Sequence, residues 1–200
     1  MARVKVVLKP GDFPGTPGDK DREDLTALFD HMFPGNDNPE IPGTAAAFGV
    51  VAQDPQLALR LIRVSDYIVR EMAWTSTRRD LQQLMMQVVN YHFKCDFSFQ
   101  AHIKPAAAVG LSAEQQALIP YWQTANAFDD EQRLVIEYTL AVVTGTVPED
   151  LFKRVVDHFG ERPAIAFTTG IGWWSMWAML IGATRPELDR KSTRLNSSHT

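Results

Sequence analysis

Apolar side chains recur every three or four residues over most of the chain, which is the spacing of one face of an α-helix. One amphipathic helix is predicted by Leu57, Leu61, Val64 and Ile68. The next is predicted by Leu81, Leu84, Met85, Val88 and His92. Strand-like alternation is nearly absent from the sequence. The pattern therefore predicts an all-α fold.

The first fifty residues are rich in proline and glycine, as in the segments 10–15 and 38–43. We interpret residues 1–50 as an extended N-terminal arm that carries one short helix over 21–33. That helix is predicted by the helical spacing of Leu25, Leu28, Phe29 and Met32. Residues 51–188 show no linker and predict one compact helical domain.

Two helix boundaries carry recognisable signals. Gly110 suits the left-handed turn that ends a helix, and Ser112 with Gln115 forms a capping box for the next helix. Thr146 with Glu149 repeats the capping-box pattern, so a further helix is expected to begin there.

A stretch without charged residues, 164–183, is long enough to span a bilayer. Its threonine, serine and glycine residues dilute the hydrophobicity, and the chain has no second stretch of this kind. We therefore expect no membrane span and interpret the stretch as a helix buried in a core or an oligomer interface. Its tryptophans are then packing residues, namely Trp173, Trp174 and Trp177.

The last residues, 189–200, match the translation of a sequencing-library adapter, and we interpret them as a non-native tail that truncates the natural frame near Leu188. Without them the chain has 17 basic and 23 acidic side chains, a net charge of −6. No run of basic residues is present, which argues against nucleic-acid binding.

Cys95 is the only cysteine, so no intramolecular disulfide can form. The first ten residues contain too short an apolar run for a signal peptide. These two observations predict a protein of the reducing cytoplasm.

Candidate chemistry begins at Cys95, because Ser98 and His102 return to its face of a helix three and seven residues later. A thiol at a helix N-terminus feels the positive end of the dipole, which lowers its pKa, and a charged His102 would lower it further. The carboxylate of Asp96 opposes this effect. A small buried cysteine and a hydrogen-bonded core histidine are the alternative interpretation.

The string Cys95-x-x-Ser98-x-x-x-His102 resembles the Cys-x-x-Cys-x-x-x-His signature of the carboxymuconolactone decarboxylase-like superfamily, which includes the alkylhydroperoxidase D-like proteins. The similarity extends over about 55–183, including the segments 79–86 and 157–160. This resemblance implies an all-helical domain of the alkylhydroperoxidase D-like type. It also implies a homo-oligomer, commonly a trimer or hexamer, that acts on a small-molecule substrate.

The resemblance assigns Cys95 and His102 as catalytic residues, whereas two other positions depart from the family pattern. Ser98 replaces the second cysteine and Gln83 replaces a glutamate of the proton relay. Serine cannot form a disulfide, so an oxidised Cys95 would need an external thiol as reductant. Glutamine cannot act as a base. His92, just before Cys95, is a candidate replacement for the relay partner.

Gln83, Gln87 and Asn90 form a polar stripe, which indicates either a polar pocket or a solvated outer face. Two further histidines, His31 and His158, lie far from the motif, and no spacing resembles a metal site. We expect neither a metal nor another cofactor.

Three functions remain open. The first is a thiol-dependent peroxidase or reductase with Cys95 as nucleophile and His102 as proton-relay partner. The second is decarboxylation of a small lactone acid without redox chemistry, although the motif helix offers no obvious arginine to hold a carboxylate. The third is a non-catalytic oligomeric domain.

Overall fold

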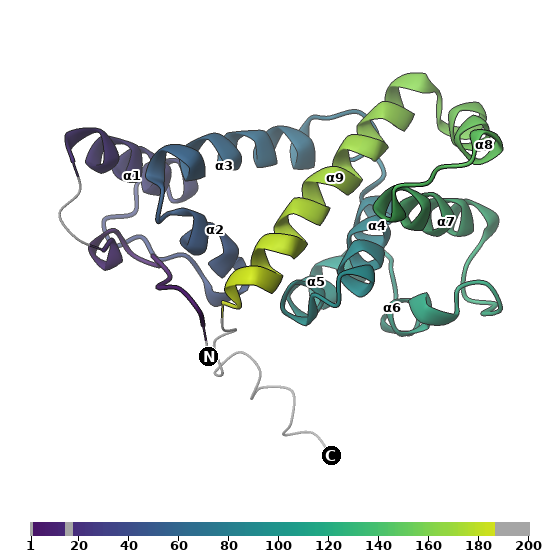
Figure 1. Cartoon of the computed structure of the whole chain (residues 1–200), viewed down its shortest axis with the longest axis horizontal. Helices are drawn as coiled ribbons and strands as arrows, with labels where there is room; N and C mark the ends of the chain where they lie inside the picture. Colours follow the sequence, from purple (N-terminus) through teal and green to yellow (C-terminus); the bar gives the residue numbers. More distant parts are fainter. Residues whose placement is uncertain (1, 15–17, 187–200) are drawn as a thin grey trace, which may run out of the picture. The chain divides into compact units, whose positions relative to one another are not determined.

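The computed structural model describes residues 2–14 and 18–186, and the described residues form helices without any strand (Figure 1). The prediction of an all-α fold is confirmed. The predicted adapter-derived tail, 189–200, lies outside the described residues.

The α-helices are α1 (Asp19–Met32), α2 (Ala46–Val51), α3 (Pro55–Arg70), α4 (Arg79–His92), α5 (Asp96–Ala108), α6 (Ala113–Leu118), α7 (Asp130–Thr144), α8 (Glu149–Phe159) and α9 (Glu161–Thr184). The 3₁₀ turns are η1 (Pro10–Asp12), η2 (Gly43–Ala45) and η3 (Ile119–Tyr121).

The described chain divides into two compact units. The first unit contains residues up to Asp66 together with 183–186, and the second contains 67–182. The N-terminal arm over 1–50 and the helical domain over 51–188 stay predictions. The boundary between the two units falls within α3, whose residues up to Asp66 group with the N-terminal segment.

In the first unit, α1 corresponds to the helix predicted over 21–33 and buries Leu25, Leu28 and Phe29. The N-terminal segment pairs with α2, since the backbone N–H of Val7 donates to the Gly49 carbonyl at 2.9 Å. A Cβ atom at Gly49 would lie 2.9 Å from the Val7 carbonyl oxygen, closer than such atoms can approach. Glycine is therefore required where the segment meets the helix.

In the second unit, α4 packs against α5 and α7. The predicted apolar face of α4 is confirmed at four of its five positions, which are completely buried: Leu81, Leu84, Met85 and Val88. The fifth, His92, is partly exposed. Aromatic rings also fill this core. Trp74 stacks on Phe167 with 4.3 Å between ring centroids, and Tyr138 lies 5.0 Å from Phe167.

The capping box of Ser112 with Gln115 is present at the start of α6. Gly110 has φ +99° and ends the turn after α5, as predicted. The second predicted box is wrong: Pro148 is the residue before α8, and α8 has no side-chain cap. A capping box that the sequence reasoning missed, Asp129 with Gln132, begins α7 instead.

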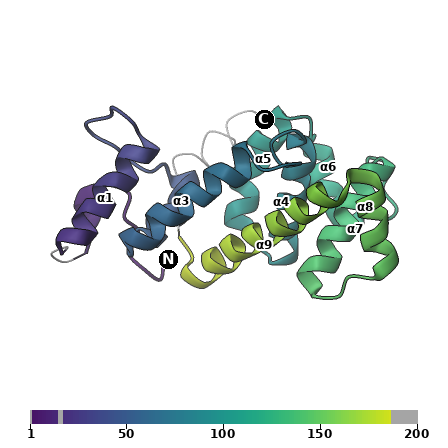
Figure 2. The same cartoon turned by 90° about the horizontal axis from the view of Figure 1, so that it is seen from above.

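Helix α9 is long and apolar enough to cross a membrane by length and composition, and 56% of its most apolar window is buried. The core helix of a soluble protein has the same properties. Trp174 and Trp177 are both buried, consistent with their predicted packing role. Figure 2 shows the N-terminal part of α9 running beside α8 within the second unit.

Candidate functional site

The turn between α4 and α5 positions Cys95. Lys94 adopts the left-handed conformation, with φ +52°, and thereby reverses the chain after α4. The backbone N–H of Cys95 then donates to the Asn90 carbonyl at 2.8 Å. As a result Cys95 is the residue immediately before α5, and only 4% of it is exposed.

The environment of the Cys95 sulfur does not favour a thiolate. Burial raises the pKa of Cys95, and the negative charge of Asp96 raises it further. The backbone N–H of Ser98 lowers this pKa without offsetting the burial. The expectation of a lowered thiol pKa is therefore wrong, because solvent is largely excluded from Cys95 at the start of the helix. Ser98, which stands where the family has its second cysteine, is itself buried.

His102 and Gln83, predicted as neighbours, are brought together by the packing of α5 on α4. His102 Nδ1 lies 3.2 Å from Gln83 Oε1. Because an amide oxygen only accepts, this contact places the ring proton on Nδ1 and leaves Nε2 as the acceptor nitrogen. Burial lowers the pKa of His102 to about 4. The imidazole is therefore neutral at pH 7, and it contributes no positive charge to the site.

The other predicted stripe residues lie inside the protein and join a residue of α6. Gln87 Nε2 donates to Gln116 Oε1 at 2.8 Å, and Asn90 Nδ2 donates to Gln87 Oε1 at 3.1 Å. We call Gln87, Asn90 and Gln116 the amide cluster. Gln116 Nε2 also donates to the Leu111 carbonyl at 3.0 Å. A solvated outer face is excluded for these residues, since Gln87 is completely buried and Asn90 is 1% exposed.

Gln116 was missed by the sequence reasoning. It lies 29 residues after Gln87 and follows a capping box that explains the polar residues around it. No local signal in the sequence distinguishes it from an exposed glutamine.

A cavity of about 530 Å³ opens beside the α4–α5 turn. Its lining includes Asn90, Tyr91, His92, Lys94, Asp96, Phe99 and Gln100. His92 therefore faces this cavity and packs edge-on against Phe93, with 4.9 Å between ring centroids. The structure joins His102 to Gln83, whereas it places His92 at the cavity.

Among residues 2–14 and 18–186, no group of three or more histidine, cysteine, aspartate or glutamate side chains is arranged to hold a metal ion. Besides the carboxylate of Asp96, the polar groups of the candidate site are amides, a hydroxyl and a neutral imidazole. Such groups donate and accept hydrogen bonds and move single protons.

No family model matches the chain, and no curated protein sequence matches it. Among solved structures, the chain resembles a protein of unknown function from Agrobacterium tumefaciens that is proposed to be the antioxidant defence protein AhpD. The TM-score is 0.63 at 18% sequence identity, and the match covers 69% of this chain and 94% of the other. The likeness establishes an AhpD-like fold for this chain.

Proposed function

We propose that this chain is a thiol-dependent peroxidase-type oxidoreductase with Cys95 as its nucleophile and His102 as its proton carrier. The observation that carries the proposal is the position of Cys95 immediately before α5, where the backbone N–H of Ser98 acts to lower the pKa of the thiol. That donor stabilises negative charge on sulfur more than it stabilises the thiol. The AhpD-like fold and the motif positions support the same chemistry.

In the first step the Cys95 sulfur attacks one oxygen of a hydroperoxide, so that an S–O bond forms while the O–O bond breaks. The proton of the thiol goes to His102 Nε2 and then to the departing alkoxide, which leaves as an alcohol. Cys95 is oxidised to sulfenic acid and the hydroperoxide is reduced. Gln83 keeps the imidazole in the tautomer that this transfer requires.

In the second step an external thiol attacks the sulfenic acid, because Ser98 cannot supply a resolving sulfur. A mixed disulfide forms and water leaves. A second molecule of the thiol then releases its disulfide and regenerates Cys95. The expected cytoplasmic location would supply such a thiol.

A second candidate, a non-catalytic helical domain, is favoured by one observation: burial raises the pKa of the Cys95 thiol. A buried, protonated thiol behaves as a small apolar side chain. The two candidates differ in what Cys95 does when peroxide and thiol are supplied.

The test is peroxide consumption by the full chain with an added dithiol, followed from pH 6 to 10, together with trapping of sulfenic acid. We expect a rate that rises with pH as the thiol ionises, is abolished in Cys95→Ser and is reduced in His102→Ala. The double variant Ser98→Cys with Gln83→Glu restores the family residues and should accelerate turnover at least about tenfold. If Cys95 resists both peroxide and alkylation even at pH 10, the non-catalytic candidate replaces the proposal.

A further inference from the structure

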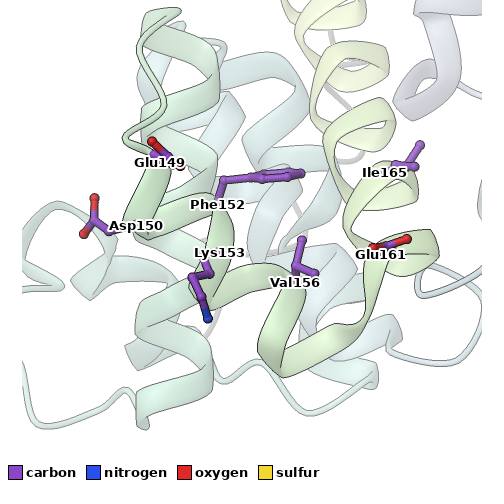
Figure 3. Close-up of a pocket in the computed structure, with 7 residues that line it drawn as sticks. All are labelled: Glu149, Asp150, Phe152, Lys153, Val156, Glu161 and Ile165. Atoms are coloured by element: carbon purple, nitrogen blue, oxygen red, sulfur yellow. The ribbon is translucent and has the colours of Figure 1, made fainter.

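A hollow of about 830 Å³ on the second unit is a groove between α8 and the start of α9 (Figure 3). We define it by its apolar floor, Phe152, Val156 and Ile165, and its acidic rim, Glu149, Asp150 and Glu161. Phe152 is 41% exposed and Ile165 is 65% exposed. Figure 3 shows the ring of Phe152 extending from α8 toward α9, with Ile165 and Glu161 on the α9 side.

The groove carries an excess of negative charge. Its one lysine, Lys153, is paired with Asp157 at 2.5 Å. Within the described ranges 2–14 and 18–186, no ion pair involves Glu149, Asp150 or Glu161. The three carboxylates also stabilise the first turns of their helices, but that role leaves their outer faces open to a cation. The groove therefore suits an amphipathic helix that carries basic side chains around an apolar ridge.

The chain itself displays such a ridge on α3. Leu57 and Val64 are 46% and 44% exposed, although the opposite face of this helix is buried at Ala58 and Ile62. The exposed residue Arg60 lies between them on the same face, and Arg63 lies on its flank. We call Leu57, Arg60, Arg63 and Val64 the α3 stripe. It combines apolar and positive groups in a chain whose overall charge is negative.

We propose that the α3 stripe of one copy docks into the α8–α9 groove of a second copy. The apolar side chains Leu57 and Val64 cover the floor at Phe152 and Ile165, and Arg60 and Arg63 meet the acidic rim. The two surfaces are different, so the contact is head-to-tail. Every subunit can then use its stripe and its groove at once, and the assembly closes into a ring if the rotation permits.

The test exchanges charge on each surface of the full chain and measures association by sedimentation velocity over a concentration series. One variant reverses the stripe, Arg60→Glu with Arg63→Glu, and the other reverses the rim, Glu149→Lys with Glu161→Lys. Wild type is expected to self-associate. Each variant alone should associate at least about tenfold more weakly, because like charges then face each other.

The decisive sample is the equimolar mixture of the two variants. In the mixture the acidic stripe of one variant meets the basic groove of the other, and the remaining two surfaces are also complementary. Association should therefore return toward the wild-type value. A control pair on other exposed surfaces, Arg22→Glu mixed with Glu114→Lys, should associate as wild type does.

Helix content and thermal unfolding of each variant verify that it is folded. If reversing the rim weakens α8 or α9, the exposed substitution Ile165→Ser provides an independent test and should weaken association in the same direction. A wild-type chain that remains monomeric at high concentration overturns the proposal. Self-association that is indifferent to all these variants, or that is not recovered by mixing, overturns it as well.

Discussion

Two polar clusters of the second unit lie near opposite ends of α4 and differ in their charge and in their burial. The amide cluster near its C-terminal end contains no charge, and Gln87 within it is completely buried. The charged cluster is anchored at Arg78, the residue before α4, which donates two hydrogen bonds of 2.7 and 2.6 Å to the two carboxylate oxygens of Glu131. Two further residues complete it. Asp80 accepts a hydrogen bond from Arg78, and His158 is hydrogen-bonded to Glu131.

Water access accounts for the difference. The Glu131 side chain is 26% exposed and the Arg78 side chain 35% exposed, so these charges are paired without being fully desolvated. The hydrogen bonds from Arg78 lower the pKa of Glu131 to about 2, and His158 adds to the effect. Around Cys95 and His102, burial instead favours the neutral form of both groups. Cys95 and His102 of the candidate site are therefore held neutral, whereas the side chains of the charged cluster are ionised and paired.

The largest effect is expected from removing the centre of the amide cluster. Gln87→Ala leaves Gln116 Oε1 and Asn90 Nδ2 without their partner and opens a cavity in the core. We expect a loss of about 3 kcal/mol in the free energy of unfolding, measured by urea titration. The exposed Gln100→Ala in α5 is the control and should change stability by less than about 0.5 kcal/mol. Equal effects of the two substitutions would contradict a structural role for the amide cluster.

An intermediate effect separates His102 from the charged cluster by pH. The folded pKa of His102 is lowered to about 4 from its ordinary 6.5, so between these values the unfolded chain binds a proton that the folded chain does not. Stability therefore rises with pH across that window. The lowered pKa of Glu131 makes stability rise in the same direction, but between about 2 and 4.5.

Urea titrations at a series of pH values check this assignment. His102→Gln should remove about 2 kcal/mol of the rise between pH 4 and 6.5 and leave the acidic window unchanged. Glu131→Gln should remove the rise in stability between about pH 2 and 4.5 and leave the rise between pH 4 and 6.5 unchanged. A wild-type stability that is flat between pH 4 and 6.5 would show that His102 is not held neutral.

The smallest effect concerns the Cys95 thiol. Asp96→Asn removes one of the two influences that raise the pKa of Cys95, while burial, the larger one, remains. Alkylation at pH 8 should accelerate about twofold, because the fraction of thiolate increases slightly. Glu114→Gln, which changes an exposed carboxylate on α6, serves as the control. An acceleration of tenfold or more would mean that the charge of Asp96, and not burial, is the main cause of the raised pKa of Cys95.

Local spacing predicted only part of the features that depend on it, since Leu57 and Val64 of the apolar face expected in α3 are exposed. The apolar face of α4 and the capping box at Ser112 follow from periodicities of a few residues, and both are present. The box predicted at Thr146 failed because Pro148 fixes the backbone before α8 and takes the capping position.

The sequence placed Gln83 and His102 at motif positions, and the structure shows that these two side chains are in contact. The roles assigned to the site residues stay predictions, and their electrostatics did not follow from the sequence. The sequence could not indicate how much solvent reaches Cys95, since its burial depends on several helices packing together. For the same reason the partnership of Gln87 with Gln116 was not foreseen.

The contact at Gly49 bears on how the chain tolerates sequence change. The N-terminal segment is attached to α2 through backbone atoms, and the space between them is limited by the absent side chain of one residue. Substitutions of the exposed side chains of the segment leave that attachment intact, whereas any substitution at position 49 would displace it. Natural variation should therefore be wide at those exposed positions and narrow at the buried Val7 and at Gly49.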